Sequence, residues 1–427
     1  MSALDKKLLR VAALAVVLLV VVHFLLHRRL GAPPKVEDPA SLANFADPYR
    51  AAVPDLSALA GRDTAAEPLD IGYVEPVSPR AFGSRSKAVR LLLAKFNGGG
   101  EDTEKAVEAG LAYLAKRQMS DGNWSRKYTV GSTGLALCAF LGAGYHHEDG
   151  DYRDVVHRGL EFLLRNQLTS GRVGRERLYA TAIAGVAFSE AYGLTGDTRY
   201  RDATVKVLDF LAGAQGPRGG WDYQPIPATP PVDKEGRPKL PRYDTSVTGW
   251  CLMAFKSARM AGVAAPKEPI EAYKKYAMEI TDENGEACYT IKPDGTKEKR
   301  YASSMTAATL MCRLYMGDTL DAPRMRQGLV RITTRLPKKE RPAWVEKQNA
   351  MDIYLWYHAA QASFLATREA WNRWNGWLRP LLVQHQVKEG DEKGSWPAEF
   401  FKHGKDSETY ATALSVLTLQ TYYRYYR

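Results

Sequence analysis

Residues Ala109–Trp124 read AGLAYLAKRQMSDGNW, and the pattern recurs as RGLEFLLRNQLTSGRV (Arg158–Val173) and KVLDFLAGAQGPRGGW (Lys206–Trp221). In each copy a leucine is followed by an aromatic residue two positions later, a leucine three positions later and a glutamine seven positions later. These spacings place the leucines and the glutamine on one face of a helix. A glycine beyond the glutamine then ends the helix. The repeat therefore predicts a series of amphipathic helices.

The spacing of the repeat sets the number of units. Four glutamines mark it: Gln118, Gln167, Gln215 and Gln386. The first three are separated by 49 and 48 residues, and the last follows 171 residues later. Because that interval corresponds to three repeats, we expect two degenerate units without the glutamine, at Ile270–Ile280 and Met325–Leu336. The chain therefore contains six units.

Each unit has a second segment that begins with hydroxyl or carboxylate residues and continues as an alanine-rich apolar run. Such a segment is typical of a helix that is buried on most sides, whereas the first helix of each unit is charged on one face. Six outer and six inner helices follow from this pattern. The second segments begin at 132–136, 179–182, 244–248, 303–306, 351–354 and 408–411.

Six hairpins of similar length predict an all-α fold, an α6/α6 toroid in which the hairpins form a double barrel. An open solenoid is the alternative arrangement. We favour closure because neither end of the repeat carries a polar capping unit. Parallel inner helices place their N-termini at one mouth, where the candidate binding residues collect. These are Tyr179, Tyr243, Asp244, Thr245, Asp352, His358, Glu408 and Tyr410.

The N-terminal part of the chain differs from the repeat. After a short tail (1–10), Val11–Leu26 is an uncharged run flanked by basic residues, and no small-residue cleavage site follows it. We therefore predict an uncleaved transmembrane signal anchor at 11–29, which makes the protein a single-pass membrane protein that contacts the bilayer. A proline-rich tether (30–100) then leads to the toroid domain (101–427), which we expect on the exported side.

Composition excludes several classes of protein. The chain has 427 residues, is 45% hydrophobic and 25% charged, and carries a formal net charge of +11. These values are those of a globular protein rather than a disordered one. Four scattered cysteines exclude a disulfide-rich scaffold and a zinc finger. The positive charge is diffuse and not interleaved with aromatic residues, so we expect no nucleic-acid partner.

The repeat resembles the QW repeat of squalene–hopene cyclases and, more broadly, the α/α toroid of terpenoid cyclases and protein prenyltransferase β subunits. The resemblance covers residues 102–427. It implies that the glutamines and tryptophans tie neighbouring outer helices together and have no catalytic role. The residues concerned are Gln118, Trp124, Gln167, Gln215, Trp221, Gln386 and Trp396.

The catalytic residues that the resemblance implies are not matched. Squalene–hopene cyclases protonate an alkene with an aspartic acid in a DxDDTA stretch, and Pro241–Ser246 is the nearest match here. Tyr243 stands where the acid should be, and a tyrosine with a pKa near 10 is too weak for that step. The Asp, Cys and His ligands of a prenyltransferase zinc site are also unmatched, so we expect no metal and no cofactor.

Asp244 is the one candidate catalytic residue. It either acts as a general acid or caps the inner helix that it begins, and the same alternatives apply to Asp352 and Glu408. The long loop Tyr223–Pro241 before it is either a lid or an elaborate turn. We therefore expect a membrane-anchored toroid that binds an apolar ligand, such as an isoprenoid or lipid, or a protein partner in its cavity without cyclase activity. The alternative is a divergent enzyme, either a terpenoid cyclase or isomerase or a carboxylate-dependent hydrolase, with Asp244 as the acid.

Overall fold

The computed structural model describes residues 79–229, 231–232, 234–300, 302–334, 352–398 and 408–424. All of the described residues belong to the second of the chain's two units, Pro54–Arg427. The predicted tail (1–10) and transmembrane segment (11–29) lie outside the described residues. None of the described helices combines the length and apolar composition needed to cross a bilayer.

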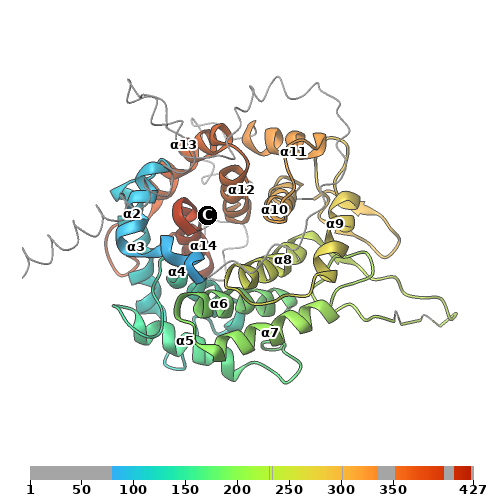
Figure 1. Cartoon of the computed structure of the whole chain (residues 1–427), viewed down its shortest axis with the longest axis horizontal. Helices are drawn as coiled ribbons and strands as arrows, with labels where there is room; N and C mark the ends of the chain where they lie inside the picture. The colour runs from blue at the N-terminus through green and yellow to red at the C-terminus, as the bar shows by residue number, and fades with distance from the viewer. Residues whose placement is uncertain are drawn as a thin grey trace, which may run out of the picture. The chain divides into compact units, whose positions relative to one another are not determined.

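Twelve helices of the second unit alternate between an outer and an inner layer (Figure 1). The outer helices are α3 (Glu101–Arg117), α5 (Arg153–Arg165), α7 (Thr198–Gly213), α9 (Glu268–Ile280), α11 (Pro323–Thr334) and α13 (Arg368–His385). The inner helices are α4 (Thr129–Gly142), α6 (Leu178–Thr195), α8 (Thr245–Met260), α10 (Ala302–Tyr315), α12 (Ile353–Ala366) and α14 (Glu408–Leu419). The two degenerate units are present as α9–α10 and α11–α12.

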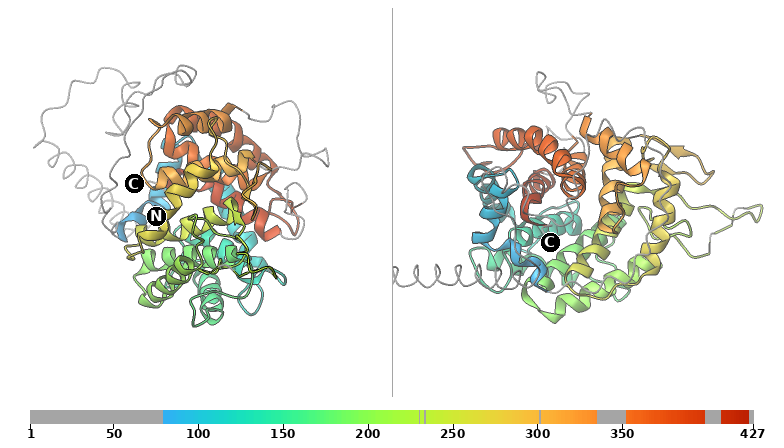
Figure 2. Two further views of the ribbon diagram at one scale, coloured as in Figure 1. Left: turned by 90° about the vertical axis from the view of Figure 1, so that its right-hand side faces the viewer. Right: turned by 45° about the horizontal axis from the view of Figure 1, so that its top comes forward.

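The inner helices form a closed ring. Each packs against its two neighbours in the order α4, α6, α8, α10, α12 and α14, and α14 returns to α4. The outer layer closes in the same way, because α3 contacts both α13 and α14. An open solenoid would leave the first and last hairpins apart, so the ring is the arrangement adopted here (Figure 2).

The glutamines of the repeat join successive outer helices, as the resemblance implied. The Nε2 of Gln118 donates to the carbonyl of Gly122 in its own turn and to that of Val155 in the next outer helix, at 3.0 and 2.9 Å. Gln167, Gln215 and Gln386 repeat this pair of bonds toward Ala203, Pro269 and Ala106. The tryptophans are buried and donate from Nε1 to a carbonyl of the preceding outer helix, namely Trp124 to Leu114, Trp221 to Leu211 and Trp396 to Leu382.

The turn glycine after each glutamine is required by close packing. Gly122 has a φ of +96°, and a Cβ added to it would lie 2.3 Å from the carbonyl oxygen of Arg158 on the next outer helix. A side chain there would force the two outer helices apart. The local turn and the spacing of the outer layer are therefore set by the same residue.

A small antiparallel sheet lies beside the start of α8. Its strands are β1 (Tyr243–Asp244), β2 (Thr290–Ile291) and β3 (Lys297–Glu298), in the order β1-β2-β3. Asp244 pairs with Thr290, which ties the loop before α8 to the loop before α10. The described part of the loop 223–241 is largely exposed and projects away from the ring (Figures 1 and 2). It therefore has the form of an elaborate turn and does not cover the mouth.

The opposite end of the ring is filled by segments from both ends of the unit. η4 (Pro79–Arg85) and α2 (Lys87–Phe96), which the sequence placed in the tether, pack against α15 (Thr421–Arg424). Arg85 donates to Glu190 of α6 at 2.9 Å, and Arg424 donates to the same carboxylate at 2.8 Å. These three charged side chains are buried.

Candidate functional site

The starts of the inner helices meet at one end of the ring, as the repeat predicts. The hydroxyl of Tyr179 on α6 hydrogen-bonds to Ser246 Oγ on α8, and the hydroxyl of Tyr354 on α12 donates to the backbone oxygen of Ser246 at 3.0 Å. Ser304 on α10 donates to Asp352 before α12 at 2.5 Å. We call this end, where the first turns of the inner helices converge, the mouth.

Asp244 is the N-cap of α8 and is fully buried. Its Oδ1 accepts from the backbone nitrogens of Ser246 and Val247 at 3.0 and 3.1 Å and from Ser246 Oγ at 2.5 Å. Its Oδ2 accepts from Arg242 at 3.1 Å, and Arg242 is held in turn by Asp222 at 2.6 Å. These bonds are those of a helix cap.

The electrostatics of Asp244 reflect its burial. Burial raises the pKa of this carboxyl above its ordinary value, and the hydrogen bonds from Ser246 and Val247 together with the charge of Arg242 oppose that rise. A general acid must also reach its substrate. Since no part of Asp244 is exposed, any proton that it supplies has to pass through Ser246 or another hydrogen-bonded neighbour.

Three tyrosines occupy equivalent positions on the inner helices. Tyr179 and Tyr354 each lie two residues after the N-cap of their helix, and Tyr410 is the third residue of α14. All three are half-buried. Burial raises the pKa of each hydroxyl, so all three stay protonated at neutral pH. The mouth thus presents fixed, neutral aromatic rings.

A second aromatic group extends this surface toward the sheet. Tyr223 and Tyr289 share a hydrogen bond of 2.8 Å between their hydroxyls. The guanidinium of Arg177 lies 4.2 Å from the centre of the Tyr223 ring, and that of Arg242 lies 4.7 Å from it. Arg177 is exposed and makes no ion pair with any other described residue. A cation is therefore available beside the aromatic rings.

The ring is filled one helical turn below the mouth. Trp250 of α8 and His358 of α12 meet there, with ring centres 6.0 Å apart, and both are buried. Three further inner helices contribute residues that are at most 5% exposed, namely Leu135, Ile183 and Leu414. Each lies two positions after a threonine of its helix: Thr133, Thr181 or Thr412. We call this layer the floor. Among the described residues, it leaves a ligand the mouth and not the barrel axis.

His358 belongs to the floor and not to the mouth where the sequence placed it. Its Nδ1 bonds to the backbone oxygen of Tyr354 at 2.8 Å, and its Nε2 has no partner among the described residues. Burial lowers the pKa of the imidazole to about 4, so the ring is neutral at physiological pH.

Two other predicted mouth residues face the outer layer. The hydroxyl of Tyr243 accepts from the backbone nitrogen of Arg218 at 3.3 Å, and Thr245 Oγ1 lies 3.1 Å from the hydroxyl of Tyr276 on α9. Both side chains point this way because the backbone at β1 is extended, so that successive side chains alternate between faces and Tyr243 and Thr245 lie on the face opposite to Asp244. The residue at the position of the cyclase acid is therefore directed away from the mouth.

Two predicted carboxylates, Asp352 and Glu408, lie at the starts of α12 and α14. Asp352 caps α12 by accepting from the backbone nitrogen of Leu355 at 3.0 Å. Glu408 is exposed, and the hydroxyl of Tyr113 lies 2.7 Å from Glu408 and 2.8 Å from Glu392. Within the described ranges, no group of three or more His, Cys, Asp or Glu side chains is placed to hold a metal.

The sequence missed several residues of this site. Tyr223, Arg242 and Tyr289 belong to it but lie outside the helices of the repeat, Tyr354 begins the inner helix of a unit that lacks the glutamine, and Ser246 lies in the first turn of α8 but was not singled out. Tyr223 follows Trp221 of the repeat by two residues, and this position was the one available signal. The pairing of Tyr289 with Tyr223 depends on the small sheet, which the repeat pattern does not predict.

Comparison with known proteins supports the resemblance. No protein-family model matches the chain. A probable squalene–hopene cyclase of Sinorhizobium fredii is 27% identical over 148 residues, which is 30% of this chain and 22% of that protein. The chain thus spans about a fifth of the length of the curated relative that it matches.

Solved structures share the fold over most of the chain. An α-1,6-mannanase of glycoside hydrolase family 76 from Salegentibacter sp. matches with a TM-score of 0.55 at 10% identity, covering 75% of this chain and 99% of that one. An unsaturated glucuronyl hydrolase from Streptococcus agalactiae gives a TM-score of 0.56 at 12% identity, with 83% and 98% covered. The type II terpene cyclase MstE from Scytonema, bound to geranylgeranyl dihydroxybenzoate, gives 0.50 at 14%, with 76% and 98% covered.

These likenesses confirm the α/α toroid that the repeat indicated. The fold is related both to terpene cyclases and to glycoside hydrolases. Since one fold serves both chemistries, the function of this chain has to be argued from its mouth.

Proposed function

We propose that the mouth binds an amphiphile with an anionic head group and an apolar body, such as an isoprenoid or lipid, without cyclising it. The observation that carries this proposal is the set of three half-buried tyrosines, Tyr179, Tyr354 and Tyr410, above a filled floor. Hydroxyls of this set are engaged by neighbouring residues, as those of Tyr179 and Tyr354 are by Ser246. His358 packs against the Tyr354 ring, with the ring centres 4.1 Å apart, and the exposed part of each tyrosine ring remains for an apolar body.

The anionic head group follows from the charges beside these rings. Arg177 lies over Tyr223, is exposed and has no acidic partner among the described residues. Asp244, by contrast, is buried and neutralised by Arg242. A ligand lying across the tyrosines would place an anionic group near an available guanidinium.

The absence of cyclisation in this proposal follows from the floor. Folding an isoprenoid for cyclisation requires an enclosed cavity and a strong acid directed into it. Here Trp250 and His358 fill the layer below the mouth, and Tyr243 is directed toward the outer layer. The ligand of MstE named above combines a geranylgeranyl chain with a benzoate, and this combination of apolar chain and acid is the chemistry that we propose for the ligand here.

Calorimetric titration with geranylgeranyl dihydroxybenzoate and with oleate tests the proposal. We expect Tyr354→Ala to weaken binding at least about tenfold, whereas Tyr354→Phe keeps the ring and most of the affinity. Arg177→Gln should weaken binding, and Arg175→Gln is the matched control because Arg175 does not contact Tyr223. Binding that survives Tyr354→Ala unchanged contradicts the proposal. Turnover of a probe that is lost in Asp244→Asn would favour the enzymatic alternative.

Membrane anchorage at 11–29 is part of the same proposal. The segment contains 16 consecutive uncharged residues between basic ones, which is close to the length that spans a bilayer. We propose that it holds the toroid on the exported side. Protease digestion of intact cells and of lysed cells checks this, since the toroid should be cleaved in both; protection in intact cells would place it inside.

One observation favours a second candidate, a carboxylate-dependent hydrolase. Glu392 and Glu408 both lie within 2.8 Å of the Tyr113 hydroxyl, which places the two carboxylate oxygens at most about 5.5 Å apart. Such a separation is that of the paired carboxylates in retaining glycosidases. Arg117 contacts both groups, however, and this pairing favours two ionised carboxylates over an acid and a nucleophile.

Release of reducing sugar from α-1,6-mannotriose tests this second candidate. Activity that is lost in Glu408→Gln and kept in Glu389→Gln, at an exposed residue of the loop that carries Glu392, would support hydrolysis. Absence of activity in the wild-type chain would exclude this substrate and leave the binding proposal in place.

A further inference from the structure

Helix α2 carries an exposed apolar face at the end of the ring opposite the mouth. Val89 is 38% exposed, Leu92 is 70% exposed and Phe96 is 41% exposed. Spacings of three and four residues place these side chains on one face of the helix. The whole helix is only ten residues long, so this face forms a large part of its surface.

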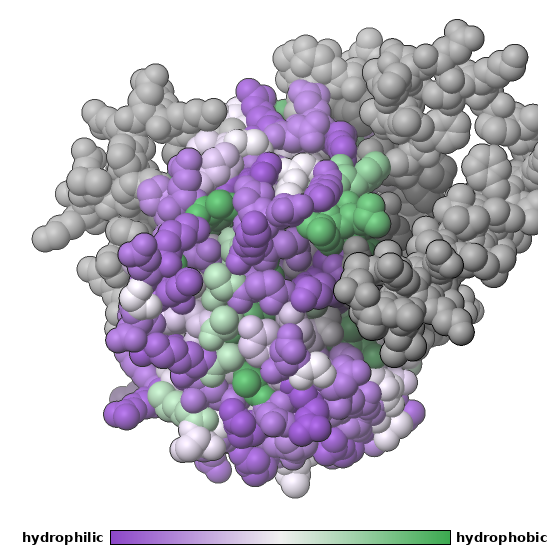
Figure 3. Space-filling view, turned by 90° about the vertical axis from the view of Figure 1, so that its left-hand side faces the viewer, coloured by the Kyte–Doolittle hydropathy of each residue, from purple (hydrophilic) through white to green (hydrophobic). Residues whose placement is uncertain are grey.

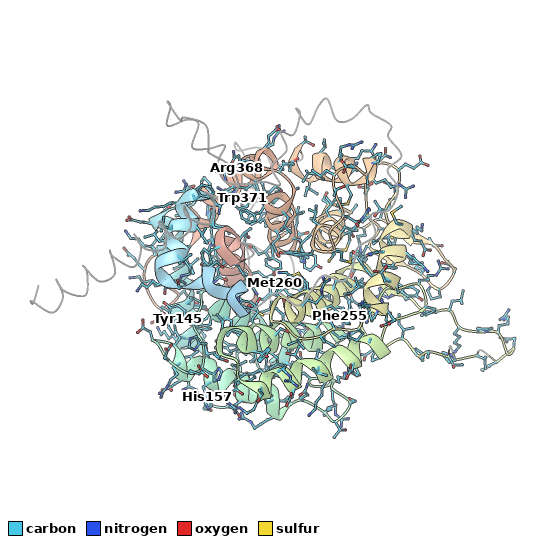
Figure 4. All side chains as sticks on the ribbon, viewed as in Figure 1. Tyr145, His157, Phe255, Met260, Arg368 and Trp371 are labelled. Carbon is cyan, nitrogen blue, oxygen red and sulfur yellow. The ribbon has the colours of Figure 1, made fainter. Side chains whose placement is uncertain are left out.

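The other side of α2 is firmly attached to the ring. Arg90 is buried and donates to Glu108 of α3 at 2.7 Å. The residue after α2, Asn97, donates to the backbone oxygen of Tyr422 at 2.9 Å and accepts from Trp371 Nε1 on its own backbone oxygen at 2.7 Å. Trp371 is labelled in Figure 4. The apolar face is therefore held in a fixed position and is not a frayed end.

This clustering distinguishes α2 from the rest of the described surface. The side of the molecule that carries α2 and α3 is shown in Figure 3, where hydrophobic patches interrupt a largely hydrophilic surface. The other exposed large hydrophobic residues are scattered over separate loops and helices: Tyr128, Leu168, Val205, Val232, Leu240 and Met278. Single exposed apolar residues need no explanation, but three on one short helix do.

Basic side chains border the apolar face. Lys95, three residues after Leu92, is exposed and forms an exposed ion pair with Glu101 at 3.4 Å, whereas Lys87 is exposed at the start of α2 on the side that carries Arg90. The guanidinium of Arg368 lies 5.4 Å from the centre of the Phe96 ring and donates to the backbone oxygen of Phe96 at 3.1 Å (Figure 4). An apolar face bordered by lysine and arginine is the composition of helices that lie in the surface of a membrane.

We propose that α2 docks onto a membrane surface that contains anionic lipids, with Val89, Leu92 and Phe96 inserted among the head groups. The basic side chains beside the face favour this partner over two others. A symmetric second copy would bring Lys95 and Arg368 of both chains toward one another. The apolar run at 11–26 of the same chain carries no acidic residue to pair with them. Anionic head groups satisfy both the apolar face and its charges.

The proposed docking surface is separate from the mouth. Helix α2 lies beside α15, where the inner helices finish, whereas the tyrosines of the mouth lie where the inner helices begin.

A fluorophore attached at Leu92→Cys in the full chain tests this inference. The native cysteines are suitable as a background because Cys138, Cys251, Cys288 and Cys312 are all buried. On vesicles with about 30 mol% phosphatidylglycerol in phosphatidylcholine, we expect a blue shift and quenching by lipids labelled in the head-group region. A label at Leu168→Cys, on another surface, should show neither. Lys87→Glu with Lys95→Glu should lower the quenching of the Leu92 label at least about tenfold, with the circular dichroism spectrum unchanged.

Several outcomes would overturn the inference. The label at Leu92 would behave alike with and without phosphatidylglycerol if no anionic surface were involved. A blue shift in detergent without lipid that is independent of protein concentration would identify the chain's own N-terminal part as the occupant. A shift that grows with protein concentration would identify a second copy.

Discussion

The side-chain amide of Gln386 donates to the backbone oxygen of Ala106, 280 residues earlier in the chain, at 2.7 Å. The same amide donates to Gly394 in its own turn at 3.0 Å. Each earlier glutamine makes the corresponding pair of bonds to the outer helix that follows it. For Gln386 the following helix is the first, α3, so this side chain joins the last outer helix to the first, together with the ion pair of Arg379 with Asp102.

Replacing this glutamine should cost more stability than replacing another of the repeat. Gln386 is 4% exposed, whereas Gln118 is half-buried. In Gln386→Ala, buried carbonyls lose their donor without access to water, so we expect a loss of about 1–3 kcal/mol in the free energy of unfolding. In Gln118→Ala, water can replace the amide and the loss should be smaller. Chemical denaturation of both variants measures the difference, and equal losses would show that closure does not depend on Gln386.

Much of this architecture can be predicted from the sequence because the repeat carries two independent signals. The glutamine positions give the number of units, and the contrast between charged and alanine-rich segments gives the two layers. Closure is less directly encoded, since the pairing of Gln386 with Ala106 joins residues from opposite ends of the repeat. The packing of residues 79–96 onto α15 was not predicted, because these residues were assigned to the proline-rich tether (30–100) and Asn97–Gly100 reads as a break.

The buried cluster of Arg85, Glu190 and Arg424 should be a main determinant of stability. Burial alone would raise the pKa of Glu190, but the charges of Arg424 and Arg85 outweigh it and lower the pKa to about 2. Glu190→Gln would leave two guanidiniums without their counter-charge, and we expect a loss of about 3–5 kcal/mol. Glu161→Gln, which breaks the more exposed pair with Arg199, is the control, with a loss of about 0–1 kcal/mol. A small effect for Glu190→Gln would mean that the cluster is not needed for the folded state.

Glu104 should give the stability a pH dependence of the opposite sign to that of an ordinary carboxylate. Burial raises its pKa to about 7, although the charge of Arg90, 3.7 Å away, opposes this. Between about pH 4.5 and 7 the folded state keeps a proton that the unfolded state has lost, so the free energy of unfolding falls as the pH rises. Glu104→Gln should remove this slope, whereas Glu101→Gln, exposed on the same helix, should leave it. Denaturation at several pH values provides the test, and a slope that persists in Glu104→Gln would contradict it.

The candidate site was predicted in part. Helix periodicity places Tyr179, Asp244 and Tyr410 at the starts of inner helices, where the structure has them. It cannot show which way residues of a non-helical segment point, so Tyr243 was placed at the mouth although the strand directs it outward. The pairing of Tyr223 with Tyr289 depends on contacts between two loops, which carry no periodic signal.

The last prediction concerns the floor below the tyrosines. Burial lowers the pKa of His358 to about 4, so its imidazole is neutral in the folded state, while in the unfolded chain it takes up a proton near pH 6.5. As the pH falls from about 6.5 to 4, the imidazole binds a proton in the unfolded state but not in the folded state, so the free energy of unfolding decreases. His358→Leu should abolish this decrease. The substitution removes the hydrogen bond between Nδ1 and the backbone oxygen of Tyr354, at a cost of about 0.5–1.5 kcal/mol, and it also removes a buried Nε2 that has no partner among the described residues. His157→Gln is the control, since that side chain is exposed on the outer helix α5 (Figure 4). The effects of His358 and Glu104 have opposite signs over part of this range, so the measurement is made in the Glu104→Gln background. If the decrease were the same in the Glu104→Gln background with and without His358→Leu, His358 would not be its source. The imidazole of His358 would then have to be solvated in the folded state, and the floor below the mouth would be open to water.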